Sequence, residues 1–184
     1  MDTKLKADIA ESEVVTQLLK RGFRVLKPVG DRLPYDLAID VNGKLVRVQI
    51  KSAWRCNGVY TVDSRRTKTN RRQMVRSRYD GNDFDFAILY IEDRDVFYVM
   101  PIEVFSSYKS GITLVESKTR QRKPRSDQYR EAWDLLNQWA AQPETAERYL
   151  SNSVKPKNGN TEPSLPKAIR LRFSGGTSAR RCRD

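Results

Sequence analysis

Histidine is absent from the 184 residues, and this absence removes several kinds of enzyme chemistry. Ser-His-Asp and Cys-His nucleophilic catalysis, histidine-containing zinc sites and nucleases with a histidine base all need an imidazole. The only cysteines are Cys56 and Cys182, too few for a four-cysteine zinc site and too far apart to suggest a disulfide framework. Catalysis by this chain would have to use carboxylates, lysine, arginine, tyrosine or a bound metal ion.

Long apolar runs are also missing. The most apolar stretch, residues 84–91, is far shorter than the roughly 20 residues that span a bilayer. The opening Met-Asp-Thr-Lys has no apolar segment behind it, which predicts that there is no signal peptide. We therefore expect a cytoplasmic protein with no membrane contact.

Acidic residues are outnumbered. Lys and Arg total 35 against 23 Asp and Glu, giving a net charge of +12, which favours a polyanionic partner, most often nucleic acid. Composition changes near position 150: residues 151–184 are rich in Pro, Gly, Ser, Asn and Thr and carry eight Lys or Arg against two acids. This pattern predicts one folded domain, residues 1–150, followed by a disordered basic tail, residues 151–184.

The periodicity within residues 1–150 predicts an α/β fold, a mixed sheet with flanking helices. A helix is expected over residues 3–21, ending at Gly22. Asn42-Gly43 between alternating runs predicts a β-hairpin. The expected strands are 23–28, 36–41, 44–53, 59–63, 85–91 and 96–100. A second helix is expected from an N-cap at Ser126 to about Ala141, with its aromatic residues in the core.

The hairpin allows its register to be worked out. With a two-residue loop, Leu37 faces Val48 on the apolar side, and Asp36 comes opposite Gln49 on the other side. Lys51 projects from that same side, so an acid, an amide and a lysine converge unless a bulge shifts the register. A solvated strand face is the alternative interpretation of such a patch.

A carboxylate on the first helix adds to this pattern. Glu11 falls near the centre of the apolar stripe Ala7, Val14, Val15, Leu18 and Leu19. A buried carboxylate costs several kcal/mol unless it is paired or coordinates a cation. It could pair with Lys51 or Arg47. Alternatively, the oxygens of Glu11, Asp36 and Gln49 suit Mg²⁺, which polarises a phosphodiester and activates water while Lys51 stabilises the developing charge.

This order of residues resembles the PD-(D/E)XK nucleases: a helix glutamate, Pro34-Tyr35-Asp36 before a strand, a tight turn, and Gln49-Ile50-Lys51 in the next strand. The similarity is greatest to homing endonucleases of this type encoded in bacterial group I introns, which carry a glutamine at the same place. It spans about residues 1–140, including Val46-Arg47-Val48 and Gln121-Arg122-Lys123-Pro124-Arg125.

The resemblance implies a restriction-endonuclease-like αβββ core and a site that uses Mg²⁺ or Mn²⁺. Catalysis would fall to Glu11, Asp36, Gln49 and Lys51, and metal binding to Glu11, Asp36, Gln49 and Ile50. Two departures from the motif stand out. Pro34 is not adjacent to Asp36, and Gln49 replaces the usual acid. The lost charge implies weaker metal binding, compensation by Glu11, or an inert DNA-binding remnant, and the resemblance favours an active enzyme.

Two basic clusters are candidates for nucleic-acid contact. The proposed contacts are Arg65, Arg66, Lys68, Arg71, Arg72, Arg76 and Arg78 in the first cluster, and Arg120, Arg122, Lys123 and Arg125 in the second. A solvated charged loop is the alternative interpretation.

The leading hypothesis is a metal-dependent endonuclease of the homing type acting on double-stranded DNA. The alternatives are a junction resolvase or restriction-type nuclease of the same fold, and an inert nucleic-acid-binding module. Cutting both strands with one site per chain predicts a homo-oligomer, a dimer or tetramer. The aromatic residues Phe97, Tyr98, Phe105 and Tyr108 would serve either its interface or the core.

Overall fold

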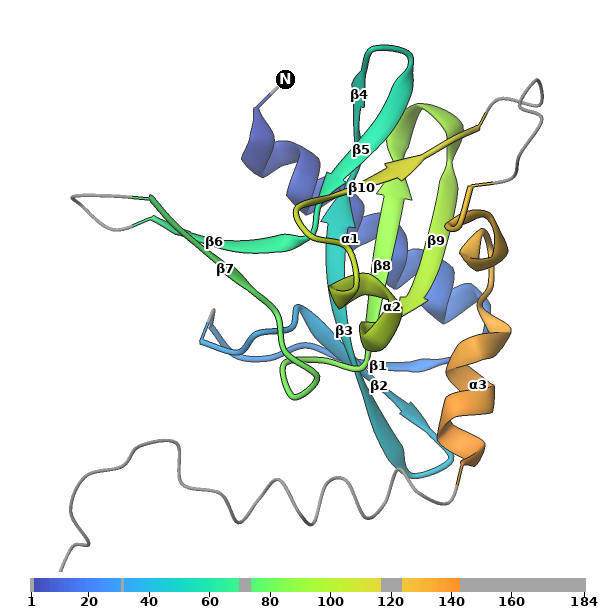
Figure 1. Cartoon of the computed structure of the whole chain (residues 1–184). Helices are drawn as coiled ribbons and strands as arrows, with labels where there is room; N and C mark the ends of the chain where they lie inside the picture. Colours follow the sequence, from blue (N-terminus) through green and yellow to red (C-terminus); the bar gives the residue numbers. More distant parts are fainter. Residues whose placement is uncertain (1, 31, 70–73, 117–123, 143–184) are drawn as a thin grey trace, which may run out of the picture. The chain divides into compact units, whose positions relative to one another are not determined.

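The computed structural model describes residues 2–30, 32–69, 74–116 and 124–142, and its central element is a five-stranded sheet (Figure 1). The strands run in the order β1-β2-β3-β8-β9. Their bounds are Arg24–Leu26, Leu37–Val41, Lys44–Ser52, Phe86–Ile91 and Val96–Pro101. Strands β3 and β8 are parallel and the other neighbours are antiparallel. The predicted α/β fold with a mixed sheet is confirmed.

The β2–β3 hairpin has the register expected from its turn. Leu37 pairs with Val48, and Val41 pairs with Lys44. Asn42 and Gly43 have φ values of 54° and 81°, and two consecutive positive φ angles define the type I′ turn that Asn-Gly favours. The sequence therefore determined which side chains share a face of β3.

Helices α1 (Thr3–Lys20) and α3 (Asp134–Ala141) pack on one face of this sheet. Asp2 caps α1 by accepting a hydrogen bond from the Lys4 amide, and Gly22, with φ 81°, follows its end. The core on this face joins Ala10, Val14, Leu18, Leu37, Ile39, Val46, Val48, Ile50, Phe86, Ile88, Trp133 and Leu136.

The other face is covered by a smaller sheet in the order β10-β5-β4 and by the short helix α2 (Figure 1). Strands β4, β5 and β10 span Trp54–Cys56, Val59–Asp63 and Gly111–Leu114, and α2 spans Ile102–Ser106. The short helix η1 (Glu92–Arg94) joins β8 to β9. Phe97, Tyr98 and Phe105 are all buried, so these three aromatic residues belong to the core.

A third, two-stranded ribbon leaves the main body after β5. It consists of β6 (Arg65–Thr69) and β7 (Met74–Arg78), paired so that Arg65 lies opposite Arg78 (Figure 1). These strands are not predictable from periodicity because their residues show no apolar alternation. We call residues 65–69 and 74–78 the basic ribbon.

The second predicted helix is wrong in its first half. Instead of one helix from Ser126, a short 3-10 turn, η2 (Asp127–Tyr129), is followed by extended Arg130 and by Glu131 at φ 51°. The Glu131 amide donates to the Phe97 carbonyl, and the Glu131 carboxylate accepts from the Phe97 amide at 2.8 Å. These bonds to β9 replace helical bonds and interrupt the helix. Ser126 stands at the N-cap position of η2, but its hydroxyl donates to the Thr113 carbonyl and makes no capping hydrogen bond.

The later part of that prediction is correct. Trp133, Leu136 and Ala140 are buried in the core, and Tyr129 packs against the opposite core cluster. The predicted tail, residues 151–184, with Cys182, lies outside the described residues. Among the helices that are described, none combines the length and apolar character needed to cross a bilayer.

Candidate active site

The centre of the site is the point where β2 begins alongside β3. The Asp36 amide donates to the Val48 carbonyl at 2.9 Å. Asp36 Oδ2 accepts two hydrogen bonds, at 2.6 Å from the Ile50 amide and at 2.5 Å from Gln49 Nε2. At the start of β2, the Asp36 side chain therefore accepts the hydrogen bond of a β3 main-chain amide, that of Ile50. The second carboxylate oxygen, Oδ1, takes part in neither bond.

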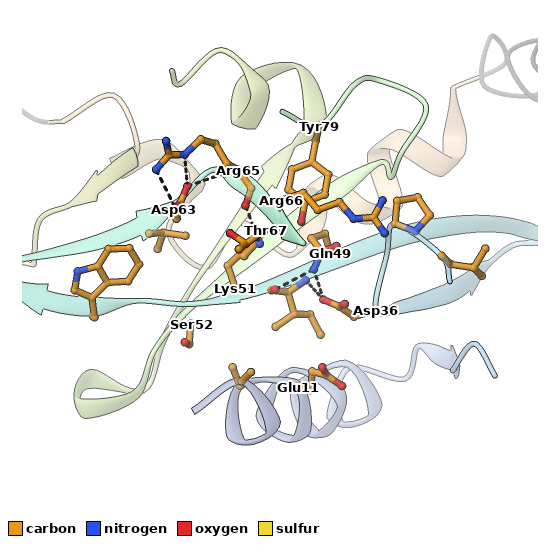
Figure 2. Close-up of a pocket in the computed structure, with 17 residues that line it drawn as sticks. Glu11, Asp36, Gln49, Lys51, Ser52, Asp63, Arg65, Arg66, Thr67 and Tyr79 are labelled. Carbon is orange, nitrogen blue, oxygen red and sulfur yellow. Dashed lines mark hydrogen bonds and ion pairs between the residues drawn. The ribbon is translucent and has the colours of Figure 1, made fainter. Parts of the chain in front are cut away.

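Lys51 lies beside this cluster on the same face of β3 as Gln49 (Figure 2). Its Nζ donates to the Arg65 carbonyl at 3.3 Å and lies 5.2 Å from the centroid of the Tyr79 ring. The hairpin thus brings Asp36, Gln49 and Lys51 together, as the register predicts.

Glu11 does not lie at the centre of the buried face of α1, where its sequence pattern predicted it. The fully buried line of the helix is Ala10, Val14 and Leu18, whereas Leu19 is 56% exposed. The stripe is rotated from the predicted one, which leaves Glu11 at its edge with 37% of its side chain exposed.

The partners expected for Glu11 are also different. Its Oε2 lies 3.5 Å from Lys27 Nζ, and Arg47 instead pairs with Asp85 at 2.9 Å. Glu11 nevertheless lines the same pocket as Asp36, Gln49 and Lys51 (Figure 2). It therefore reaches the site from α1 without being a buried charge.

The electrostatics of the site follow from this burial. Burial is the main reason that the pKa of Asp36 is raised to about 6. The negative charge of Glu11 contributes to this rise, while the Ile50 amide and Lys51 oppose it. Burial lowers the pKa of Lys51, against the raising effect of Asp36. Proton affinities displaced in this way are common at catalytic sites because the charged groups are close and shielded from water.

The pocket above these residues has a volume of about 420 Å³ and extends to the basic ribbon. Arg65 and Arg66 line it (Figure 2), and the Arg65 guanidinium binds Asp63 at 2.9 Å. Arg76 and Arg78 lie exposed on β7, and Lys68 belongs to β6. The first basic cluster therefore begins at this pocket.

Most of the second cluster lies outside the described residues, as do Arg71 and Arg72 of the first. The residues concerned are Arg120, Arg122 and Lys123. Arg125 is described, and its guanidinium carbon lies 5.3 Å from the centroid of the Tyr108 ring.

The pocket residues that the sequence did not assign to the site include Trp54, Asp63 and Tyr79. Asn57-Gly58, with φ values of 49° and 79°, is a second Asn-Gly turn. It could have predicted the β4–β5 hairpin that carries Trp54 and Asp63. Tyr79 has no comparable local signal, because it is brought to Lys51 by the path of the basic ribbon.

The donor atoms at this site fit a small, hard divalent cation. Within the described part of the chain, no three Asp, Glu or Cys side chains are grouped closely enough to bind a metal by themselves. Asp36 and Glu11 instead supply two carboxylates beside the Gln49 amide and the Ile50 carbonyl. Mg²⁺ commonly takes one or two protein carboxylates, other oxygen ligands and water, so these residues match its preferences.

The fold and this constellation define a nuclease of the PD-(D/E)XK class. A family model described as PD-(D/E)XK endonuclease matches residues 1–136, and the chain belongs to that family. Among solved structures, it is similar to a bacterial homing endonuclease, I-Ssp6803I, with 56% identity and a TM-score of 0.73. That match covers 78% of this chain and 99% of the other. No curated protein matches the chain.

Proposed function

We propose that this chain is a metal-dependent homing endonuclease that hydrolyses phosphodiester bonds in double-stranded DNA. The observation that carries the proposal is the convergence of the Asp36 carboxylate, the Gln49 amide and the Lys51 ammonium in one pocket beside a basic ribbon. Family membership supports the nuclease chemistry, and the bacterial homing endonuclease similar to this chain supports the homing type.

Each residue has a proposed role in that reaction. Asp36, Glu11, Gln49 and the Ile50 carbonyl would hold Mg²⁺ or Mn²⁺. When bound, the ion polarises the phosphodiester and lowers the pKa of a water ligand. Lys51 stabilises negative charge that develops on the phosphoryl oxygens, or orients the attacking water. Ile50 serves through its main chain, because its side chain belongs to the core.

The basic ribbon provides the proposed route for DNA to the site. Arg66 lines the pocket, and Arg76 and Arg78 are exposed farther along the ribbon. Phosphate contacts of this kind position a duplex without selecting its sequence. Because the described residues form one such site in each chain, double-strand cleavage is expected to require a dimer or tetramer. We expect it to act in the cytoplasm.

Plasmid cleavage tests this proposal. The purified chain is incubated with supercoiled plasmid in Mg²⁺ or in EDTA. One plasmid carries an intronless copy of the locus at which the gene for this chain lies, and the other lacks that locus. We expect linear product only from the first plasmid and only with Mg²⁺. Asp36→Ala should abolish the product while DNA binding is retained. Glu13→Ala, on the same helix as Glu11 but outside the pocket, is the control.

The other outcomes identify the alternatives. Metal-dependent cutting of both plasmids would retain the nuclease chemistry and overturn the homing role. Cleavage of a four-way junction but of neither plasmid would identify a resolvase. DNA binding without cleavage of any of these substrates, unaffected by EDTA or Asp36→Ala, would identify an inert binding module.

A further inference from the structure

The surroundings of Lys51 include an aromatic ring that the proposed chemistry does not use. Lys51 Nζ lies 5.2 Å from the centroid of the Tyr79 ring and 3.3 Å from the Arg65 carbonyl oxygen. A ring face within about 6 Å attracts an ammonium group, and a carbonyl accepts one of its hydrogens. The lysine nitrogen is thus held by two contacts, neither of which comes from its own strand.

The Tyr79 ring is itself fixed by the core. It is 6% exposed and packs edge-on against Phe84, with 5.0 Å between centroids. Phe105 lies 6.1 Å away on the same cluster. In Figure 2 the Tyr79 side chain enters the pocket from the side opposite α1. A ring that is anchored in this way provides a rigid surface for a flexible lysine side chain.

Both contacts come from the base of the basic ribbon. Arg65 is the first residue of β6 and pairs with Arg78, the last residue of β7. Tyr79 follows Arg78 directly. The strand pairing therefore ties the carbonyl and the ring together, and the same ribbon carries the arginines proposed to contact DNA.

We propose that Tyr79 is a positioning residue: its ring, with the Arg65 carbonyl, sets the place of the Lys51 ammonium, so the basic ribbon couples DNA contact to the geometry of the active site. This inference rests on the proposed nuclease function. It assigns the ring, and not the hydroxyl, as the part of Tyr79 that acts on Lys51.

Two substitutions separate the ring from the hydroxyl. Tyr79→Phe keeps the ring, whereas Tyr79→Leu keeps an apolar side chain but removes the ring. We expect the single-turnover cleavage rate at saturating DNA and Mg²⁺ to fall about 10- to 100-fold in Tyr79→Leu, as small misplacements of catalytic groups do. Tyr79→Phe should retain most of the rate, and DNA affinity measured in EDTA should be unchanged in both. Phe97→Leu removes a buried ring from the core cluster on the other face of the sheet, where it does not anchor Tyr79, and is the control for stability.

A second measurement reports on Lys51 without any cleavage. In protein labelled with ¹³C at the lysine ε-carbons, the Lys51 ε-proton signal, assigned with Lys51→Arg, should be shifted upfield by the ring. The shift should persist in Tyr79→Phe and disappear in Tyr79→Leu. Equal rates in the Phe and Leu variants, or a Lys51 signal that ignores the loss of the ring, would overturn the inference. If the wild-type chain cuts nothing while the signal behaves as expected, the nuclease proposal fails and the contact itself stands.

Discussion

Gln49 donates its side-chain amide to Asp36, with 2.5 Å between Nε2 and Oδ2. The same nitrogen lies 3.2 Å from the Ile50 carbonyl oxygen. The amide N–H₂ group therefore bridges two of the groups to which we assign metal binding. For Gln49 to offer its oxygen as a ligand, the amide must turn over, because only its oxygen can bind a cation.

Replacing Gln49 with glutamate tests this relationship. Gln49→Glu removes the donor and sets a second carboxylate beside Asp36, so the metal-free protein should lose about 1–3 kcal/mol of unfolding free energy. Mg²⁺ should then raise the melting temperature more than in the wild type, because a third carboxylate strengthens its binding. Thermal unfolding in EDTA and in excess Mg²⁺ measures both effects. Gln138→Glu, an exposed residue of α3, makes the same charge change, and equal responses in the two variants would contradict the prediction.

The raised pKa of Asp36 predicts how stability depends on pH in the absence of metal. The ordinary pKa of an aspartate is 3.8, and that of Asp36 in the folded chain is about 6. Between these two pH values the native state holds a proton that the unfolded state has released. The free energy of unfolding should therefore fall as pH rises through this window, by about 3 kcal/mol in total for this group. The stabilisation is complete below pH 3.8.

Urea unfolding in EDTA at several pH values between 4 and 7 checks this slope. Asp36→Asn removes the titrating group, so the difference between wild type and variant should decrease steadily from pH 4 to pH 7. The same change at the exposed Asp8 of α1 serves as the comparison. Parallel curves for wild type and Asp36→Asn would contradict the prediction.

The hairpin that carries the site could be predicted because its determinants are local. Asn42-Gly43 sets the turn type, and a two-residue loop leaves one register that buries Leu37, Ile39, Val46 and Val48 together. Once that register is set, Asp36 and Gln49 must be neighbours. The order of the catalytic candidates along the chain then carried the resemblance to the family.

The features that were missed depend on partners distant in sequence. The helix expected from Ser126 is broken because Glu131 binds β9 through both its amide and its carboxylate. The position of Glu11 depends on which side of α1 faces the sheet. The apolar pattern of the helix does not determine that orientation by itself. Tyr79 is brought to Lys51 by the basic ribbon, and the two polar strands of that ribbon lack the apolar alternation that would have predicted them.

The exposed setting of Glu11 predicts a substitution that separates activity from stability. The ion pair of Glu11 with Lys27 has side chains that are 37% and 55% exposed, and such pairs contribute below about 1 kcal/mol. Glu11→Gln should leave urea unfolding nearly unchanged while the Mg²⁺ concentration for half-maximal cleavage rises. Lys27→Met breaks the same ion pair and keeps the carboxylate. If it weakens the Mg²⁺ response equally, Glu11 acts only through that pair.

The basic ribbon predicts a salt dependence that identifies its role. Arg76 and Arg78 alternate along β7 and are exposed on the same side of the strand. If each neutralises one phosphate, Arg76→Gln with Arg78→Gln should lower the slope of log K against log salt concentration by about 2. Affinity would fall at low salt without a change in melting temperature. Gel shifts across a salt series in EDTA measure the slope. The control, Arg24→Gln with Lys20→Gln, removes two exposed charges outside the ribbon. If its slope changes as much as that of the β7 variant, DNA affinity depends on net charge alone.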